Sequence, residues 1–176
     1  EMLAGADGVL VPGGFGARGL EGKIAAIQYA RENGLPSLGL CLGMQMAVVE
    51  FARHVLDLRD AHTSEVDPHT TYPVIDLMED QDLGNLGGTM RLGKYRCLLT
   101  PGTISERAYG TTEIWERHRH RYEFNNAFLD RFTAGGMIAA RRHPDRNLVE
   151  HVEIPSHPFF VAVPLHPELQ SRPHRP

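Results

Sequence analysis

The chain has 176 residues, of which 41% are hydrophobic, with two cysteines and a formal net charge of −4. This length fits about one domain with a sizeable core, and the mild negative charge gives no indication of a nucleic-acid or membrane partner. The longest apolar runs are far too short to span a bilayer, and no signal peptide is recognisable at the N-terminus. Two cysteines are too few for a disulfide framework, so we expect a cytoplasmic protein.

The first third of the chain alternates strand and helix patterns. Residues 8–11 (GVLV) predict a short buried strand, and a glycine-rich loop (PGGFGARG) follows. Apolar spacing then predicts a helix over 20–33, a strand over 37–40 and a second helix from Met44 onward. This βαβα order predicts a parallel sheet with right-handed crossovers, flanked by helices.

The rest of the chain predicts further strands with one excursion. Residues 59–71 are polar and loop-like, and the glycine-rich stretch 79–103 predicts a β-hairpin excursion that includes Cys97 as a core residue. We expect strands at 72–78, 116–123, 135–143, 148–155 and 159–163, and a short helix at 127–133. The last residues are predicted to be extended. No internal repeat or domain boundary is visible, so residues 1–176 are treated as one domain.

Cys41 lies between Gly39 and Gly43, at the junction of a predicted strand and a predicted helix. This arrangement is typical of a nucleophile elbow with cysteine in place of serine. The glycines keep side chains away from a sharp turn, and the N-terminus of the helix favours a thiolate. The alternative is a buried structural cysteine, which is the usual state of a lone cysteine but requires neither glycine.

A thiol nucleophile needs a base, and the base needs an orienting group. His166 and Glu168 follow the last predicted strand in the sequence LHPEL, where the carboxyl ends of parallel strands place catalytic residues. Taken alone, a His-Pro-Glu turn is weak evidence, and an ordinary surface loop is the alternative. Together with the elbow, it predicts a Cys-His-Glu triad.

The loop PGGFG after the first strand allows backbone N–H groups to approach a ligand closely. In an acyl-transfer enzyme this loop would supply one oxyanion donor, and the N–H of Leu42 would supply the other. Phosphate binding is disfavoured because the spacing matches neither a dinucleotide-binding motif nor a P-loop. A plain turn remains the simpler alternative.

The stretch ERHRHRYE concentrates basic residues on what we expect to be a strand. His118 and His120 would share one face, and Arg117, Arg119 and Arg121 the other. A metal site would need a third ligand, which no spacing supplies, so we expect none. A solvated charged strand is one interpretation, and an arginine that pairs with a substrate carboxylate is another.

Several of these motifs together resemble the glutamine amidotransferase domains of CTP synthases. The resemblance runs from about residue 8 to 173 and includes PGGFGARGLEG, LGLCLGMQ, SEV, LGGTMRLG, ERHRHRYEFNN and HPE. The GxCxG elbow marks the class I, or triad, amidotransferases as a whole, whereas the first loop, LGGTMRLG and RHRHRYE are specific to the CTP synthases. The resemblance implies an α/β fold with a mostly parallel central sheet, flavodoxin-like and three-layered.

The family's functional residues can be carried over by position. The resemblance implies Cys41 as nucleophile with His166 and Glu168 completing the triad, and the N–H groups of Gly14 and Leu42 as the oxyanion donors. For glutamine binding it implies two sets: Gly14, Phe15, Leu42, Gly43, Met44 and Gln45 around the elbow, and Glu65 and Arg121 at the amino-acid end of the substrate.

The family also implies partners and elements outside this sequence. Its amidotransferase domain normally has a strand, a helix and a strand before the position of Glu1, and a closing helix after Pro176. A separate synthetase domain binds ATP, Mg²⁺ and UTP, GTP is an allosteric activator, and the whole enzyme is a homotetramer. We therefore expect a glutaminase module without a cofactor of its own, which hydrolyses glutamine to supply ammonia for the amination of UTP to CTP.

Two other functions remain open at this point. Another cysteine hydrolase could use the same elbow, such as a γ-glutamyl hydrolase or a peptidase-like enzyme. Alternatively, the chain could be an inactive structural or regulatory fragment. The motifs LGGTMRLG and RHRHRYE argue against the first alternative, and the intact triad argues against the second.

Overall fold

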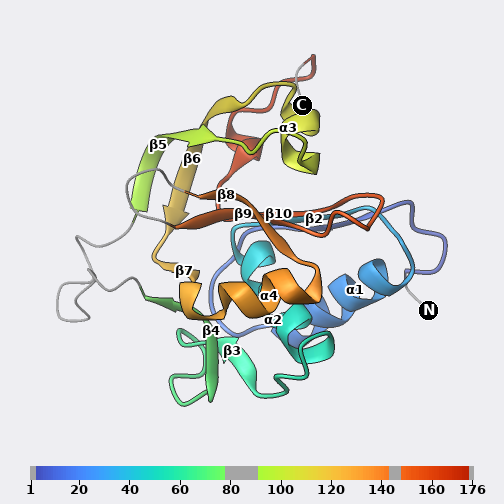
Figure 1. Ribbon diagram of the computed structural model, residues 1–176, viewed down its shortest axis with the longest axis vertical. Coiled ribbons are helices and arrows are strands. Elements are labelled where there is room, and N and C mark those ends of the chain that lie inside the picture. Colours follow the sequence, from blue (N-terminus) through green and yellow to red (C-terminus); the bar gives the residue numbers. More distant parts are fainter. Residues whose placement is uncertain (1–2, 78–90, 143–147, 175–176) are drawn as a thin grey trace.

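The structure is a computed structural model that describes residues 3–77, 91–142 and 148–174. Its centre is a five-stranded sheet in the order β1-β2-β10-β9-β8 (Figure 1). The bounds are β1 (Val9–Val11), β2 (Ser37–Leu40), β10 (Phe160–Val163), β9 (Val149–Glu153) and β8 (Ile138–Arg142). The first three strands run parallel, and β9 and β8 extend the sheet with antiparallel pairing. The predicted α/β fold is confirmed.

Different elements cover the two faces of this sheet (Figure 1). One face carries the helices α1 (Leu20–Glu32), α2 (Leu42–His54) and α4 (Leu129–Gly135), the last preceded by the 3₁₀ turn η2 (Asn126–Phe128). The other face carries β5 (Arg91–Leu98), α3 (Ile104–Tyr109) and β6 (Glu113–His120). A small sheet of β3 (Ala61–Thr63), β4 (Tyr72–Leu77) and β7 (Tyr122–Phe124) borders α2, and η3 (Pro167–Leu169) follows β10.

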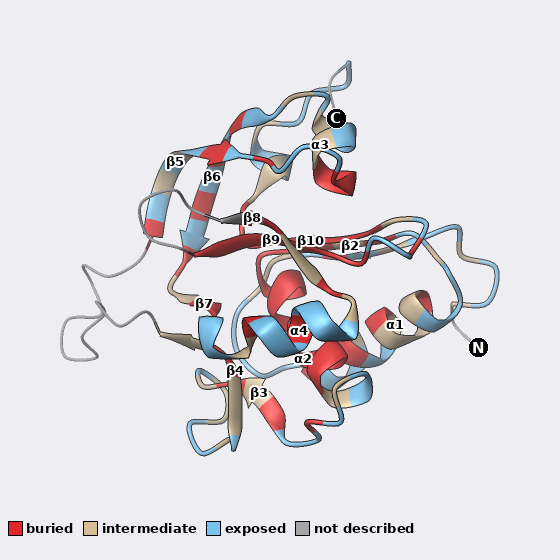
Figure 2. Cartoon of the chain, viewed as in Figure 1, coloured by how far each residue is buried: buried red, intermediate tan, exposed pale blue. Residues whose placement is uncertain are grey.

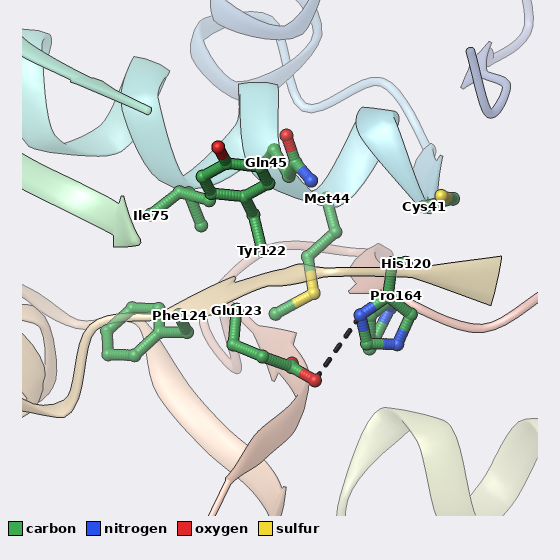
Figure 3. A pocket seen from close by; sticks show the side chains of 9 residues that line it. All are labelled: Cys41, Met44, Gln45, Ile75, His120, Tyr122, Glu123, Phe124 and Pro164. Atoms are coloured by element: carbon green, nitrogen blue, oxygen red, sulfur yellow. Dashed lines mark ion pairs between the residues drawn. The ribbon is translucent and has the colours of Figure 1, made fainter. Parts of the chain in front are cut away.

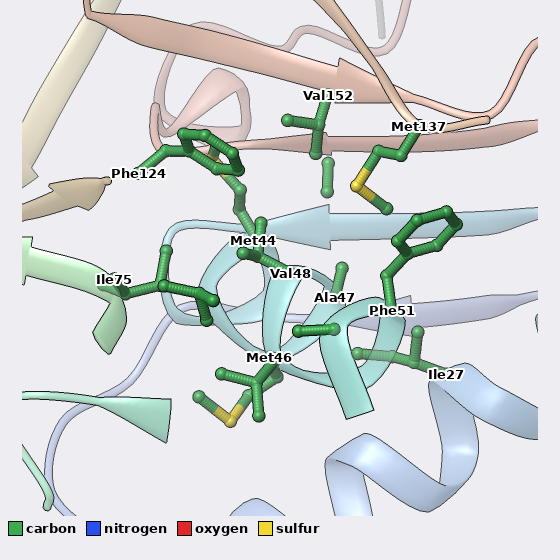
Figure 4. Close-up of a cluster of buried hydrophobic side chains, with 14 of the residues drawn as sticks. Ile27, Met44, Met46, Ala47, Val48, Phe51, Ile75, Phe124, Met137 and Val152 are labelled. Atoms are coloured by element: carbon green, nitrogen blue, oxygen red, sulfur yellow. The ribbon is translucent and has the colours of Figure 1, made fainter. Parts of the chain in front are cut away.

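The apolar sequence of β10 explains this layering. Phe160 and Ala162 belong to the hydrophobic cluster around α2, whereas Val161 and Val163 belong to the cluster under β5, β6 and α3. Since successive strand residues point to opposite faces, a strand that is apolar throughout must be covered on both sides. Figure 4 shows the larger cluster, where α2 packs between the sheet and its neighbours.

Helix α2 is buried on almost every side, and it includes a carboxylate. All residues from Leu42 to Ala52 are buried, and the helix is mostly red in Figure 2. Glu50 is among them. Arg31 of α1 neutralises Glu50, with Nη2 at 2.7 Å from Oε1 and Nε at 3.0 Å from Oε2. This ion pair links α1 to α2. Removing either side chain would destabilise the protein, because the other would be left as an uncompensated buried charge.

Several details differ from the sequence predictions. Helix α2 begins at Leu42, two residues earlier than Met44, and the loop predicted over 59–71 contains β3. Residues 78–90 of the predicted hairpin lie outside the described residues, and β5 pairs along its full length with β6. The connection between β5 and β6 holds α3, whose first N–H groups donate to the buried carboxylate of Glu153 at 2.9 and 3.0 Å. Among the helices of the described segments, none has the length and apolarity required to cross a bilayer.

Gly39 and Gly43 allow β1, β2 and α2 to meet without intervening side chains. A Cβ atom at Gly43 would lie 2.1 Å from the carbonyl oxygen of Val11, and one at Gly39 would lie 2.8 Å from the Gly43 carbonyl. Both contacts are to backbone, which cannot rotate out of the way as a flexible side chain can. The two glycines that flank Cys41 therefore fix how closely the strand, the turn and the helix pack.

We expect Gly43→Ala to destabilise the protein by about 3 kcal/mol, at the upper end of the usual cost of overpacking. The matched control is Gly22→Ala in the exposed part of α1, where an added Cβ would meet nothing within 4 Å. That variant should gain about 0.5–1 kcal/mol, because alanine is the better helix former. Urea denaturation measures both changes. A Gly43→Ala variant as stable as the wild type would contradict the close packing described here.

Candidate active site

Cys41 occupies the turn between β2 and α2 in a strained backbone conformation. Its φ is 51° and its ψ is −105°, a conformation that residues other than glycine rarely adopt. The surroundings impose this geometry: the Cys41 N–H donates to the carbonyl of Val163 at 2.7 Å, and the Cys41 carbonyl accepts from Met44 N at 3.0 Å. Strain of this kind costs about 1–3 kcal/mol and concentrates at functional sites. The cysteine thus has the geometry of a nucleophile elbow.

His166 and Glu168 follow β10 and reach the same turn. The Nδ1 atom of His166 lies 2.6 Å from Oε1 of Glu168, which orients the ring. The Nε2 atom is buried and makes no hydrogen bond within the described part of the chain. Gly13 lies against both catalytic side chains, since a Cβ atom there would be 3.1 Å from Cε1 of His166 and 3.4 Å from Cβ of Cys41. The geometry therefore brings the three expected triad residues together.

The acidity of Cys41 differs from the expectation of a resting thiolate. Burial raises the pKa of the Cys41 thiol to about 11, although the backbone N–H of Leu42 acts in the opposite direction. The carboxylates of Glu168, Glu65 and Glu123 raise this pKa further. The predicted effect of the helix N-terminus is real, but desolvation outweighs it. At neutral pH the substrate-free protein holds Cys41 as a thiol, so a base must remove its proton.

A cleft of about 660 Å³, part of it open to solvent, begins at Cys41. Six of the residues expected to bind glutamine line it: Gly14, Phe15, Leu42, Gln45, Glu65 and Arg121. The other two have different positions. Gly43 packs against Val11, and Met44 lines a smaller pocket of about 220 Å³ on the inner side of Cys41 (Figure 3).

Glu65 and Arg121 give the cleft opposite charges away from the elbow. Burial raises the pKa of Glu65, and the charge of Arg121 partly counteracts this effect. Across the cleft, the guanidinium of Arg119 stacks on the ring of Phe15 with 5.6 Å between Cζ and the ring centroid. An amino acid carries one ammonium and one carboxylate, so this pairing of charges is suited to a zwitterionic ligand.

The alternation predicted for 117–121 is visible in β6, where His118 and His120 are buried and Arg117 and Arg119 are exposed. Cys97, His118 and Glu150 place possible metal-ligand atoms within 4.8 Å of one another. However, Arg91 already contacts Glu150 through an ion pair, which matches the carboxylate's charge. This favours a buried ion-pair and hydrogen-bond cluster over a cation site.

Sequence reasoning missed two parts of this site. Gly13 was not distinguished from its neighbours in PGGFG, because only the folded chain shows that it lies against both the cysteine and the histidine. The carboxylates Glu123 and Glu150 were not assigned either, although Glu123 belongs to the quoted motif RHRHRYE. Arg91, which contacts both carboxylates, lies on β5, so no sequence spacing reveals these two pairs.

Comparison with known proteins places the chain in a family. The family model for class I glutamine amidotransferases matches residues 1–176. CTP synthases of Staphylococcus saprophyticus and Clostridium acetobutylicum are 58% and 60% identical to the chain over its whole length. The chain spans 33% of each of these relatives, or about a third of their length.

Solved structures agree with this placement. The glutaminase domain of Trypanosoma brucei CTPS, solved with bound acivicin, is 40% identical and superposes with a TM-score of 0.92 over 99% of this chain and 68% of that one. A glutamine amidotransferase from Thermotoga maritima is 13% identical with a TM-score of 0.55 over 90% of this chain and 56% of that one, which shows a shared fold alone. The chain therefore belongs to the class I glutamine amidotransferase family, in the branch formed by the glutaminase domains of CTP synthases.

Proposed function

We propose that this chain hydrolyses the side-chain amide of glutamine, and that the ammonia it releases aminates UTP to CTP elsewhere in the same enzyme. One observation carries the proposal: the strained Cys41, the His166–Glu168 pair and the cleft with Glu65 and Arg121 meet at one place. The family membership and the acivicin-bound relative support it.

In the first half of the reaction, Cys41 attacks the amide carbon of glutamine while Nε2 of His166 accepts the thiol proton. The carbonyl oxygen becomes an oxyanion that the N–H groups of Leu42 and Gly14 stabilise. His166 then donates its proton to the leaving nitrogen, and the C–N bond breaks. This step yields ammonia and a γ-glutamyl thioester on Cys41.

In the second half, His166 removes a proton from water, which attacks the thioester carbon. The C–S bond breaks, the proton returns to the sulfur, and glutamate leaves. Glu168 stabilises the imidazolium in both halves, because its carboxylate accepts from Nδ1 of His166. Glu65 would hold the substrate's ammonium and Arg121 its carboxylate, which keeps the amide next to Cys41 throughout.

The remaining two thirds of the relatives' length supports a second part of the proposal. We infer a synthetase domain that binds ATP, Mg²⁺ and UTP, activation by GTP, and a homotetrameric enzyme in the cytoplasm. The amidotransferase domain itself would gain a strand-helix-strand unit beside β1, and a closing helix. Among the described strands, β1 pairs with β2 alone, so its other edge is open to such an addition.

Replacing Cys41 tests the proposed nucleophile. Cys41→Ser should lower glutamine hydrolysis by about 10⁴-fold or more, because a hydroxyl at neutral pH is a far weaker nucleophile than a thiol with an adjacent base. The matched control is Cys97→Ser, the same substitution at the other buried thiol, which keeps a side chain of similar size beside His118 and Glu150 and should retain the activity. Glutamate release by the full-length enzyme measures both. Loss of activity in the control alone would assign the reaction to Cys97 instead.

Replacing Arg121 tests the proposed contact with the substrate's carboxylate. Arg121→Ala should raise KM for glutamine about 10- to 150-fold and change kcat much less, since a charge-assisted contact contributes about 1.5–3 kcal/mol. Arg117→Ala provides the control, because that side chain is exposed on β6 and does not line the cleft. An unchanged KM in a folded Arg121→Ala variant would refute the role.

A further inference from the structure

Strand β6 contacts the nucleophile, the base and the substrate cleft in turn. The carbonyl of Arg117 accepts from the backbone N–H of His166 at 2.8 Å, and His118 forms an isolated bridge with Leu165. The carbonyl of Arg119 lies 3.9 Å from Sγ of Cys41, and Arg121 lines the cleft just after the strand ends. The backbone of residues 117–121 therefore sets the distance between the two halves of the triad.

Buried polar side chains hold this strand from its inner face. Nε2 of His120 lies 2.9 Å from Nδ1 of His118, and Nδ1 of His120 lies 3.3 Å from Oε1 of Glu123 (Figure 3). In the contact between the two rings, one nitrogen donates and the other accepts, so the pair links His118 to His120 along the inner face of the strand. Burial lowers the pKa of His120 to about 3, so its ring is neutral at physiological pH.

The acidic end of the cluster is anchored on β5. Arg91, which pairs with His120 in the β5–β6 register, has Nη1 at 3.8 Å from Oε1 of Glu123, and its Nη2 contacts Glu150. Two buried carboxylates thus face one guanidinium and the histidine pair. Because these charges are buried together, removing one member leaves its neighbours without a compensating charge.

The same cluster borders the active site. His120 lines both the substrate cleft and the inner pocket behind Cys41, and Glu123 lines the inner pocket (Figure 3). We propose that His120 and Glu123 are positioning residues for glutamine hydrolysis: they fix residues 117–121 of β6, and through them the relative placement of Cys41, His166 and Arg121. This inference rests on the proposed function.

The test is steady-state glutamine hydrolysis by the full-length enzyme, with kcat divided by the number of sites that a glutamine-like diazoketone labels at Cys41. This correction removes losses that come from unfolded protein. His120→Leu should lower the corrected kcat about 100-fold, since about 1 Å of misplacement costs a factor of that size. His120→Asn keeps a polar side chain beside Glu123 and should recover at least tenfold of the loss.

The matched control is His151→Leu, the same substitution at a fully buried histidine of β9 that lines neither pocket. It should lower the melting temperature and leave the corrected kcat within about threefold of the wild type. Equal losses of corrected kcat in the two leucine variants would overturn the proposal, because they would indicate a general effect on packing.

Glu123→Gln provides a variant of nearly unchanged shape, which covers the case in which His120→Leu does not fold. It should lower the corrected kcat about tenfold while the protein stays folded, and an unchanged kcat would overturn the proposal. These results distinguish the positioning role from the proposed function. A wild-type enzyme that releases no glutamate would refute the function. A His120→Leu variant with a corrected kcat equal to that of the wild type would refute only the positioning role.

Discussion

The crowded turn around Cys41 is the constraint on which the site depends. The Val11 carbonyl lies so near Gly43 that β1, β2 and the first turn of α2 meet through backbone alone. This contact leaves Cys41 with a positive φ and a buried sulfur. Burial keeps the thiol protonated, although the Leu42 N–H favours the thiolate. The fold therefore positions the Cys41 thiol without ionising it. The reaction depends on a base that is placed close enough to the sulfur to remove its proton.

That base comes from the opposite end of the chain, and β6 connects it to the elbow. His166 lies beyond β10, and its ring is fixed by Glu168 on one side and its backbone by the Arg117 carbonyl on the other. The strand has polar residues on its inner face, where an apolar strand would pack more simply. Buried ion pairs contribute little net stability, but removing one partner leaves an uncompensated charge. We infer that this cluster holds β6 in place between two triad segments that lie more than 100 residues apart.

The sequence was sufficient for features with local causes. The apolar periodicity of α1, α2 and β10 and the glycines around Cys41 predicted the elbow and the parallel strands. Features with non-local causes were missed. Strand β3 has three residues, which are too few to show the alternation of apolar and polar residues that marks a strand. Strand β5 pairs with β6 across a connection that contains α3, so neither strand could be paired from its local sequence. The thiol acidity was predicted in the wrong direction, because desolvation arises only once α2 and β6 enclose the sulfur.

The most direct measurement of the central claim is the rate at which iodoacetamide alkylates Cys41 in the substrate-free protein between pH 6 and 9.5. Only the thiolate reacts, so a pKa of about 11 predicts a rate that rises about tenfold per pH unit without a plateau. Peptide mapping by mass spectrometry separates the Cys41 adduct from any at Cys97. A rate that levels off below pH 8 would show that Cys41 is already a thiolate in the substrate-free protein. That result would contradict the account in which a base must first remove the thiol proton.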